Sequence, residues 1–355
     1  MGKYMRMTDP SACVHCHKCR ESCSFLEKYG LDIGDADRMS SLLYHCFLCG
    51  RCSEVCPEGI DGKQILLDMR RSQVAEHGGR LQEPGYEGLL DEKVGYRYRN
   101  YDYNRKQQEQ KGRGQSGSGN VVLFVGCNFP SYYPKTTEML AKLLMEKAGI
   151  ETVFDCCGKP VSELGLADEA GEMIAGINRK LRDLSATEVV MVCPNCYAYL
   201  KGRLEAKVTM IYEKLQEFGL GEPLSGKRNI FLPCPDRESR TVLKSLRPFL
   251  VEEPELILDV QCCGLGGCAG RKEPELAAEM LRQIMCGNYS EGKQGKAPVR
   301  DVDTYCASCA GNIARQGYGQ AGHLLVQILG LQETPDAVHA RENREKFSAI
   351  RKIPV

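Results

Sequence analysis

The sequence predicts a helical N-terminal region followed by an α/β region that occurs twice. Cysteines at short, regular spacings fill the first 57 residues, whereas strand-like apolar runs alternate with helical patterns from residue 120 onward. In the second region, two adjacent cysteines and a glycine occur at Cys156-Cys157-Gly158 and again at Cys262-Cys263-Gly264. The predicted fold class is therefore α plus α/β, with a duplicated C-terminal part.

Length and charge exclude several classes of function. The chain has 355 residues, which is enough for two or three domains. Its 47 basic and 47 acidic residues cancel, which argues against a general nucleic-acid or anionic-membrane surface. No apolar run is long enough to span a bilayer, and the first residues lack the apolar segment of a signal peptide. We therefore expect a cytoplasmic protein with no nucleic-acid partner and no direct membrane insertion.

The 20 cysteines indicate metal or redox chemistry. In a reducing compartment such thiols serve as metal or redox ligands, and disulfide frameworks belong mainly to short secreted chains. Adjacent cysteines are poor disulfide partners and awkward ligands for one zinc ion. They suit a multi-iron cluster, in which neighbouring thiolates bind different irons.

Two runs near the N-terminus have the cysteine spacing of bacterial ferredoxins. Each run reads Cys-x2-Cys-x2-Cys-x3-Cys; Pro57 follows the second run, but Ser24 follows the first in place of the usual proline. In two-cluster ferredoxins the fourth cysteine of each run ligates the other cluster. The runs therefore predict two cubane [4Fe–4S] clusters. The first cubane set is Cys13, Cys16, Cys19 and Cys56. The second cubane set is Cys46, Cys49, Cys52 and Cys23.

Zinc is the alternative metal for these runs. Structural zinc sites usually take four ligands as two separated pairs, so two complete four-cysteine runs favour cubane clusters. His15 and His17 lie inside the first run. Because all eight thiolates are present, we expect both histidines to be solvated or hydrogen-bonding residues.

Apolar spacing predicts helices between the two runs and after the second run, where Gly78-Gly79 ends the pattern. Residues 1–80 are thus predicted to form a helical ferredoxin domain. Residues 81–120 are predicted to be a linker arm that ends in a polar, glycine-rich stretch. The tyrosines and arginines of this arm are of a type that stacks on nucleic-acid bases, but the balanced charge favours packing on the next domain or on a partner.

The α/β region divides into halves at 121–226 and 227–332, followed by a charged tail at 333–355. Strands are expected at 121–125, 152–154, 188–192, 229–232, 256–260 and 299–304. Long helices are expected at 134–148, 167–184 and 274–285. Corresponding cysteines of the two halves lie 107, 106 and 113 residues apart, which indicates an internal duplication. Because the cysteines follow the strands, we expect them at the carboxyl ends of a sheet.

Each half has a cysteine, then Cys-Cys-Gly, then Cys-x-x-Cys, and this pattern resembles the cysteine-rich CCG domain family. With two cubane runs in front, the chain resembles the D-type subunit of heterodisulfide reductase. It also resembles the iron–sulfur subunits of glycerol-3-phosphate, glycolate and lactate dehydrogenases. The resemblance covers roughly residues 10 to 330.

The resemblance implies one noncubane [4Fe–4S] cluster in each half, in two CCG domains related by pseudo-twofold symmetry. The first CCG set is Cys127, Cys156, Cys157, Cys193 and Cys196. The second CCG set is Cys234, Cys262, Cys263, Cys306 and Cys309. In the reductase, these cysteines act in catalysis through the bound clusters, which split a disulfide with electrons from the cubanes. The gap from Cys127 to Cys156 is shorter than the family pattern and the gap from Cys263 to Cys306 is longer, which puts each cluster site in doubt.

We therefore expect an oxidoreductase subunit that reduces a small disulfide, as in heterodisulfide reductase. No flavin, nicotinamide or c-type haem motif occurs, so electrons must come from a partner: a flavoprotein, a hydrogenase-type subunit or a membrane cytochrome b. A membrane partner, such as the cytochrome b, would also hold the chain peripherally at the membrane. The alternative is a relay without its own substrate, between a dehydrogenase or electron-transfer flavoprotein and a quinone. A zinc-stabilised interaction protein is the third hypothesis.

Three residues outside these sets have chemistry of interest. Cys268 follows a glycine-rich turn near Cys263, where it either lines a cleft or fills space as a small residue. Cys286 is expected on a helix. His323 is expected to start a helix, with proton donation near the clusters as the alternative role.

Overall fold

The computed structural model describes residues 6–96, 120–287, 300–317 and 319–348. Most of the predicted linker arm (97–119), residues 288–299 and the last residues (349–355) lie outside the described part. The chain divides into two compact units. Unit 1 comprises 1–87, 160–168 and 258–300, and unit 2 comprises 88–159, 169–257 and 301–355.

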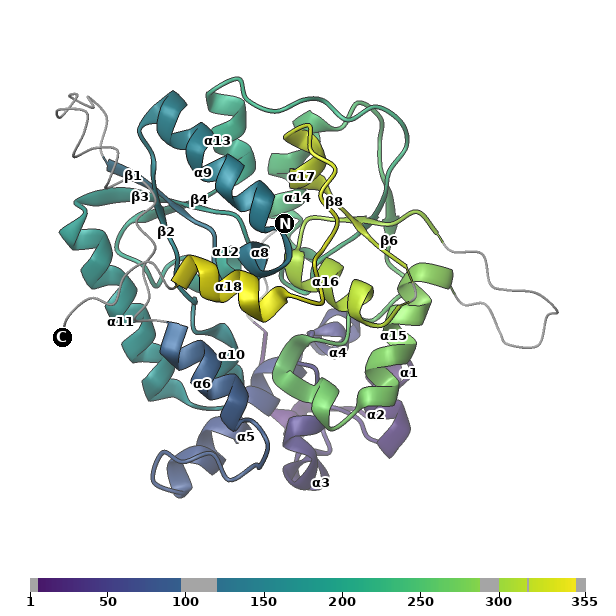
Figure 1. The fold of residues 1–355 in the computed structure, drawn as a ribbon. Coiled ribbons are helices and arrows are strands. Elements are labelled where there is room, and N and C mark those ends of the chain that lie inside the picture. Colours follow the sequence, from purple (N-terminus) through teal and green to yellow (C-terminus); the bar gives the residue numbers. More distant parts are fainter. Residues whose placement is uncertain (1–5, 97–119, 288–299, 318, 349–355) are drawn as a thin grey trace. The chain divides into compact units, whose positions relative to one another are not determined.

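Unit 1 is built from helices and turns around the two ferredoxin-type runs, and its early part is purple in Figure 1. Its N-terminal segment contains η1 (Pro10–Ala12), α1 (Lys18–Glu21), α2 (Ser24–Tyr29), α3 (Ala36–Met39), η2 (Ser40–His45), α4 (Arg51–Val55) and α5 (Gly62–Glu76). Its later segments contribute most of α10 (Lys159–Glu163), η5 (Gly266–Arg271) and α15 (Pro274–Cys286). The prediction of a helical rather than β-rich N-terminal domain is confirmed.

Helix α5 shows why the sequence signals its ends. Asp61 caps the N-terminus, because its side chain accepts a hydrogen bond from the main-chain N–H of Gln64. Gly78 and Gly79, both with left-handed backbone, follow the last turn. The buried face includes Ile65 and Leu66. Asp35 is the N-cap residue of α3, but its side chain makes no cap hydrogen bond there.

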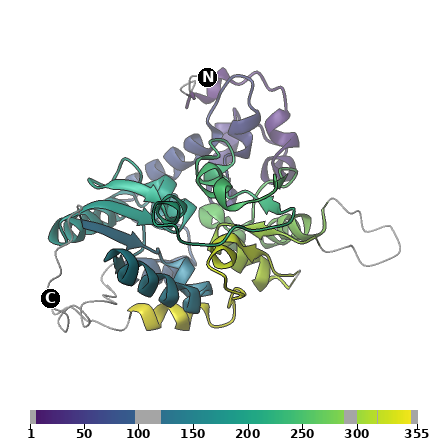
Figure 2. The same ribbon diagram turned by 90° about the horizontal axis from the view of Figure 1, so that it is seen from above.

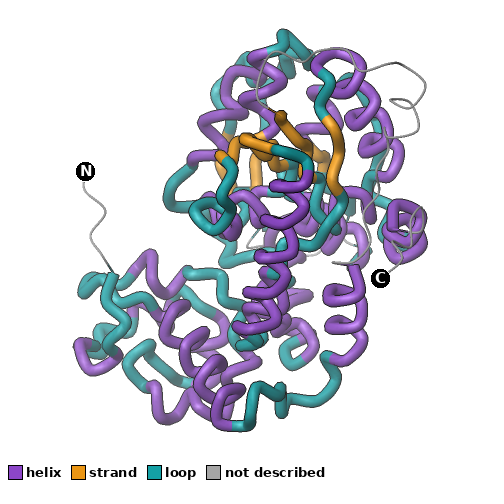
Figure 3. The backbone as a smooth tube through the Cα atoms, turned by 90° about the vertical axis from the view of Figure 1, so that its left-hand side faces the viewer, coloured by secondary structure: helices purple, strands orange, loops and turns teal. Residues whose placement is uncertain are grey.

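Unit 2 contains two parallel four-stranded sheets, whose strands are orange in Figure 3. The first has the order β2-β1-β3-β4 and the second the order β6-β5-β7-β8. The first comprises β1 (Asn120–Phe124), β2 (Glu151–Val153), β3 (Ala186–Met191) and β4 (Lys207–Met210). The second comprises β5 (Asn229–Phe231), β6 (Glu255–Ile257), β7 (Asp303–Thr304) and β8 (Gly322–His323). Six of these strands were predicted; β4 and β8 were not.

The helices of unit 2 connect these strands. Early in the unit are α6 (Glu87–Tyr96), α8 (Asn128–Tyr132), α9 (Pro134–Ala148), α11 (Ala167–Asp183), α12 (Pro194–Leu200) and α13 (Ile211–Glu217). Later come η3 (Cys234–Asp236), α14 (Thr241–Leu246), η4 (Arg247–Phe249), α16 (Ala307–Arg315), α17 (Leu324–Ile328) and α18 (Ala340–Ser348). Helix α9 has the predicted ends because proline opens it and Gly149 closes it in the left-handed region.

The predicted C-terminal tail contains a packed helix. Helix α18, which is yellow in Figures 1 and 2, contacts α8, which is labelled beside it in Figure 1. Its Asn343, Arg344 and Phe347 are buried, and the Phe347 ring stacks on Phe154 at 5.1 Å. Only every third or fourth residue of this charged segment is buried. The overall composition of the segment therefore does not predict the packed helix. Among the described helices, none is long and apolar enough to cross a bilayer.

Candidate iron–sulfur sites

The first cubane set lines one pocket of unit 1. Its four cysteines come from the N-terminal loop, from α1 and from the turn before Pro57, and the pocket walls also include Ile33 and Ile60. The fourth cysteine thus lies beside the three of the other run. Thiols from two loops facing one small, mostly apolar pocket have the donor chemistry of a [4Fe–4S] ligand set.

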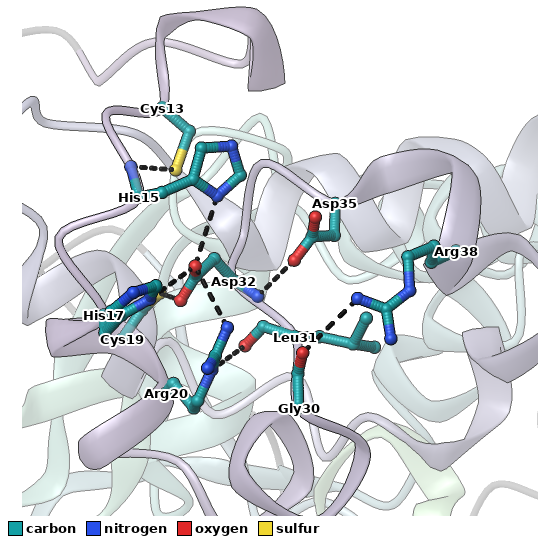
Figure 4. A network of polar contacts seen from close by, with 10 residues as sticks. All are labelled: Cys13, His15, His17, Cys19, Arg20, Gly30, Leu31, Asp32, Asp35 and Arg38. Atoms are coloured by element: carbon teal, nitrogen blue, oxygen red, sulfur yellow. Dashed lines mark hydrogen bonds and ion pairs between the residues drawn. The ribbon is translucent and has the colours of Figure 1, made fainter.

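A buried carboxylate organises the loop that carries this set (Figure 4). Asp32 is 1% exposed, and its Oδ2 accepts hydrogen bonds from Nδ1 of His15 at 3.2 Å and Nδ1 of His17 at 2.8 Å. Arg20 Nη2 lies 3.3 Å from the same oxygen. Burial alone would raise the pKa of Asp32, but the two histidines and Arg20 outweigh burial and hold it below its usual range. Both histidines are thus hydrogen-bonding residues, as expected.

The second cubane set also clusters within unit 1. Burial and the neighbouring thiols of Cys49 and Cys46 raise the pKa of Cys23. Burial and the other three thiols of the set likewise raise the pKa of Cys52. Cys23 and Cys52 therefore resist ionising beside these neighbouring thiols. Bound iron would relieve this repulsion, because it supplies positive charge and requires deprotonated ligands.

The two runs share a backbone feature that fits cluster binding. The main-chain N–H of His15 lies 3.4 Å from Cys13 Sγ, and that of Leu48 lies 3.4 Å from Cys46 Sγ. Both residues follow the first cysteine of their run by two positions and have positive φ. Backbone donors to sulfur are among the features that tune such clusters.

Arg70 of α5 stabilises the loop that carries the second set. Its guanidinium is fully buried and donates five hydrogen bonds to main-chain carbonyls at 2.6–3.0 Å. The acceptors are the carbonyl oxygens of Leu43, Cys46, Glu163 and Gly267. The residue therefore joins three separate stretches of chain within unit 1.

In unit 2, the first CCG set forms one continuous line of contacting thiols. The three parallel strands β1, β2 and β3 end just before its members, which brings them to one edge of the first sheet. Side-chain hydrogen bonds run through the line and continue into two cysteines of the second CCG set. In order of contact this thiol chain is Cys127, Cys156, Cys157, Cys196, Cys193, Cys306 and Cys309.

Two members of the thiol chain are biased toward thiolate. Hydrogen bonds from Cys156 and Cys196 lower the pKa of Cys157. Hydrogen bonds from Cys193 and Cys309 lower the pKa of Cys306 well below its ordinary value. Five closely spaced thiols at one sheet edge have the donor chemistry of an iron–sulfur ligand set. Gly126 keeps the edge open, since a Cβ there would lie 3.1 Å from Cys196 Sγ.

A buried cation faces the start of the thiol chain. Lys93 of α6 is 7% exposed, and its Nζ lies 3.5 Å from Cys127 Sγ. Burial alone would lower the pKa of Lys93, but the neighbouring sulfurs of Cys127, Cys156 and Cys157 outweigh burial and raise it. Lys93 is therefore charged and compensates negative charge at this set.

Buried polar groups that make no hydrogen bond within the described residues lie near Cys306. The hydroxyls of Tyr133 and Tyr212 and both ring nitrogens of His323 are buried and make no hydrogen bond within the described residues. The His323 ring lies 5.0 Å from the Tyr133 ring. Burial lowers the pKa of His323 to about 4, so the imidazole is neutral. Unpaired buried groups are rare in folded proteins, and three together mark a place where another group belongs.

The rest of the second CCG set divides between the units. Cys234 lies in unit 2 at the start of η3, whereas Cys262 and Cys263 follow β6 and belong to unit 1. There, Cys262 Sγ lies 3.3 Å from Met280 Sδ. Cys268 lies in η5 with positive φ, and Cys286 ends α15, as predicted. His323 precedes α17 and starts it, also as predicted.

Sequence reasoning missed four residues that contact the cysteine sets: Asp32, Arg70, Lys93 and Gln261. Each reaches its cysteines from an element distant in sequence, so no spacing announces it. Only Gln261 carried a signal, because it stands directly before Cys262-Cys263.

Comparisons with known proteins agree with this geometry. Residues 9–60 match a 4Fe-4S dicluster domain, and residues 121–201 match a cysteine-rich (CCG) domain. These matches define an iron–sulfur electron-transfer protein with cubane [4Fe–4S] clusters in its N-terminal domain and a cysteine-rich domain after it.

Similar proteins narrow the class. The B-type subunit of the fumarate reductase (CoM/CoB) of Methanothermobacter marburgensis is 25% identical over 77% of this chain and 63% of its own length. The D-type subunit of the dihydromethanophenazine:CoB–CoM heterodisulfide reductase of Methanosarcina acetivorans is 22% identical over 66% of this chain and 64% of its own length. The EtfAB:quinone oxidoreductase of Syntrophomonas wolfei is 23% identical over 76% of this chain and 42% of its own length. The chain therefore spans less than two thirds of each of these relatives, and it is an iron–sulfur protein like the D-type subunit of heterodisulfide reductase.

Proposed function

We propose that this protein is an oxidoreductase subunit that reduces a small disulfide between two noncubane [4Fe–4S] sites. The observation that carries the proposal is the thiol chain of unit 2. It joins all five cysteines of the first CCG set directly to Cys306 and Cys309 of the second set. Two cluster sites with neighbouring ligands would let one small molecule reach both clusters.

The ligand assignments follow the four sets. We assign one cubane to each cubane set and one noncubane cluster to each CCG set. The corresponding strand orders of the two sheets support a duplication, with CCG domains at 121–226 and 227–332 related by pseudo-twofold symmetry. A ferredoxin domain at 1–80, an arm at 81–120 and a C-terminal segment at 333–355 complete this division.

The reaction consumes two electrons and two protons. The S–S bond of a disulfide RS–SR′ breaks, each sulfur gains one electron, and each resulting thiolate takes one proton to give RSH and R′SH. Clusters bound to the four cysteine sets would supply these electrons one at a time. Lys93 compensates the negative charge that gathers near Cys127, while His323, Tyr133 and Tyr212 offer unpaired polar groups beside Cys306.

The printed names of two relatives indicate the substrate class. Both the fumarate reductase and the heterodisulfide reductase name the thiols CoM and CoB. We therefore propose a mixed disulfide of two small thiols. Electrons would come from a partner protein of the flavoprotein, hydrogenase-type or cytochrome b class, and a membrane partner would place this subunit peripherally at the bilayer.

The test is disulfide reduction by protein purified without oxygen. A reduced viologen dye serves as the electron donor and CoB–CoM heterodisulfide as the substrate, and dye oxidation is followed together with the release of free thiols. Two thiols should appear for every two electrons consumed. The Cys193→Ser variant should lose this activity, whereas Cys286→Ser should retain it. Fully loaded wild-type protein that releases no thiol would overturn the proposal.

A relay without its own substrate is the second candidate. It is favoured by the similarity to the EtfAB:quinone oxidoreductase, whose printed name couples an electron-transfer flavoprotein to a quinone. In that case the loaded protein should pass electrons from the viologen dye to a soluble quinone and leave disulfides intact.

A further inference from the structure

Gln261 connects the second cubane set to the second CCG set within unit 1. Its Nε2 lies 3.4 Å from Cys23 Sγ and 3.6 Å from Cys49 Sγ. The next two residues in the chain are Cys262 and Cys263. One buried amide therefore touches two ligands of one proposed cluster and is one peptide bond from a ligand of another.

The orientation of this amide follows from Ser24. Its main-chain N–H and its hydroxyl each donate a hydrogen bond of 2.8 Å to Gln261 Oε1. A main-chain N–H can only donate, so the oxygen of the amide must face Ser24. The NH2 group, with its two donors, must then face the sulfurs of Cys23 and Cys49.

This arrangement gives a physical reason for the departure from the ferredoxin pattern at Ser24. Proline follows the last cysteine of the second run, but proline has no N–H to donate. A proline at position 24 would leave the Gln261 oxygen without its main-chain partner. Serine there supplies two donors, which lock the amide with its NH2 toward the thiolates.

We propose that Gln261 is a positioning residue that raises the reduction potential of the cluster at Cys23, Cys46, Cys49 and Cys52. Because Gln261 directly precedes Cys262, the same contacts also link that cluster, through one side chain and the main chain, to the cluster at Cys262 and Cys263. N–H donors to ligand sulfurs stabilise the more negative, reduced state of a cluster. The inference rests on the proposed function only in requiring that both sets hold clusters.

The test is a redox titration of the holo protein, monitored by EPR, which separates the signals of the two cubane clusters. Gln261→Glu keeps the length of the side chain and an oxygen toward Ser24, but it replaces the NH2 donors with a second oxygen. One cubane signal should shift to a more negative potential, and the other should stay in place. Gln261→Leu, which removes the donors without adding charge, should shift the same signal in the same direction.

Two further variants make the result specific. Ser24→Pro should give a smaller shift of the same signal, because it frees the amide without removing it. Gln283→Leu is the matched control: Gln283 is a glutamine of the same unit whose Nε2 bonds Glu279, so it should shift neither signal. A cubane with a more negative potential is a stronger reductant, so slower electron transfer from it to the cysteine-rich sites in Gln261→Leu, followed by rapid freezing, would report loss of the contact path. Gln283→Leu should transfer electrons at the wild-type rate.

The outcomes separate this inference from the proposed function. Unchanged cubane potentials in both Gln261 variants, at full iron content, would overturn the role of Gln261 and leave disulfide reduction standing. A selective shift together with no disulfide reduction by the wild-type protein would support Gln261 and overturn the proposed substrate. A wild-type protein without cubane signals would overturn both.

Discussion

Nη2 of Arg70 lies 2.9 Å from the main-chain carbonyl oxygen of Cys46, so a fully buried guanidinium supports a loop that carries the second cubane set. Its other hydrogen bonds also go to main-chain carbonyls rather than to a carboxylate. The position of this loop thus depends on one side chain of α5 as well as on the cysteines.

Replacing Arg70 should destabilise unit 1 strongly. Arg70→Met leaves four buried carbonyl groups short of a donor, and a loss of at least about 3 kcal/mol in the free energy of unfolding is expected. Arg70→Lys, which keeps the charge but lacks the planar fork, should lose less. Denaturant unfolding of the anaerobic protein measures both. A loss under about 1 kcal/mol in Arg70→Met would show that water replaces the guanidinium and that the loop is supported otherwise.

Removing the positive charge of Lys93 should change the first CCG site. In Lys93→Met the thiolates near Cys127 lose their buried counter-charge, so the potential of a cluster there should become more negative and disulfide reduction should slow. Lys93→Arg should preserve much of both properties. An EPR-monitored titration reports the potential, with the cubane signals of unit 1 as internal references. Equal potentials in Lys93→Met and the wild type would contradict a role of this charge at the site.

The unpaired groups around Cys306 should matter for chemistry more than for folding. Because His323 makes no hydrogen bond within the described residues, His323→Phe should change the free energy of unfolding by less than about 1 kcal/mol. Disulfide reduction should fall, and its dependence on pH should change, because the site loses a group able to pass protons. The same measurements of stability and disulfide reduction on Tyr212→Phe serve as the comparison. A large loss of stability with unchanged activity would assign His323 to packing alone.

Acid should remove the stabilisation that Glu273 provides. Its carboxylate is buried and accepts hydrogen bonds from Lys28 Nζ at 2.6 Å, from the Tyr29 hydroxyl at 2.7 Å and from His45 Nδ1 at 2.6 Å. Burial alone would raise the pKa of Glu273, but these three bonds outweigh burial and lower it. A carboxylate with a lowered pKa stabilises the fold above its unfolded pKa of about 4.3, and this stabilisation is lost as pH falls through the folded value.

The measurement is the difference in the free energy of unfolding between the wild type and Glu273→Gln. It should be constant from about pH 6 to pH 8 and should shrink below about pH 4.5. Acid also attacks iron–sulfur clusters, so both proteins are compared at the same pH. A difference that grows on acidification would show that Glu273 is protonated in the folded protein.

Local signals in the sequence predicted most elements that position the cysteines. The ends of α9 follow from Pro134 and Gly149, and the strands β1, β2 and β3 follow from short apolar runs before cysteines. Strand β8 was missed because it has two residues, which is too short for any periodicity. The grouping of Cys23 with the second run came from ferredoxin spacing, whereas the contact of Cys193 with Cys306 depends on how the two sheets pack.

Residues that tune the sites could not be predicted, because their role exists only after folding. Lys93 lies on a helix whose sequence has no strong amphipathic pattern, and its charge would suit a solvated surface equally well. Arg70 lies on the buried face of α5, but the four carbonyl groups that it binds come from distant stretches of chain. Ser24 was visible only as a departure from the ferredoxin pattern, and its reason appears with Gln261.

Iron and acid-labile sulfide per chain, measured on protein purified without oxygen, test most directly whether all four cysteine sets hold clusters. Four clusters of four irons predict about 16 irons and about 16 sulfides per chain, with no zinc. About 8 irons per chain would contradict clusters in the cysteine-rich part, if anaerobic reconstitution with iron and sulfide does not raise this number. Only the two ferredoxin-type sites would then be filled, and electron relay would replace disulfide reduction as the function.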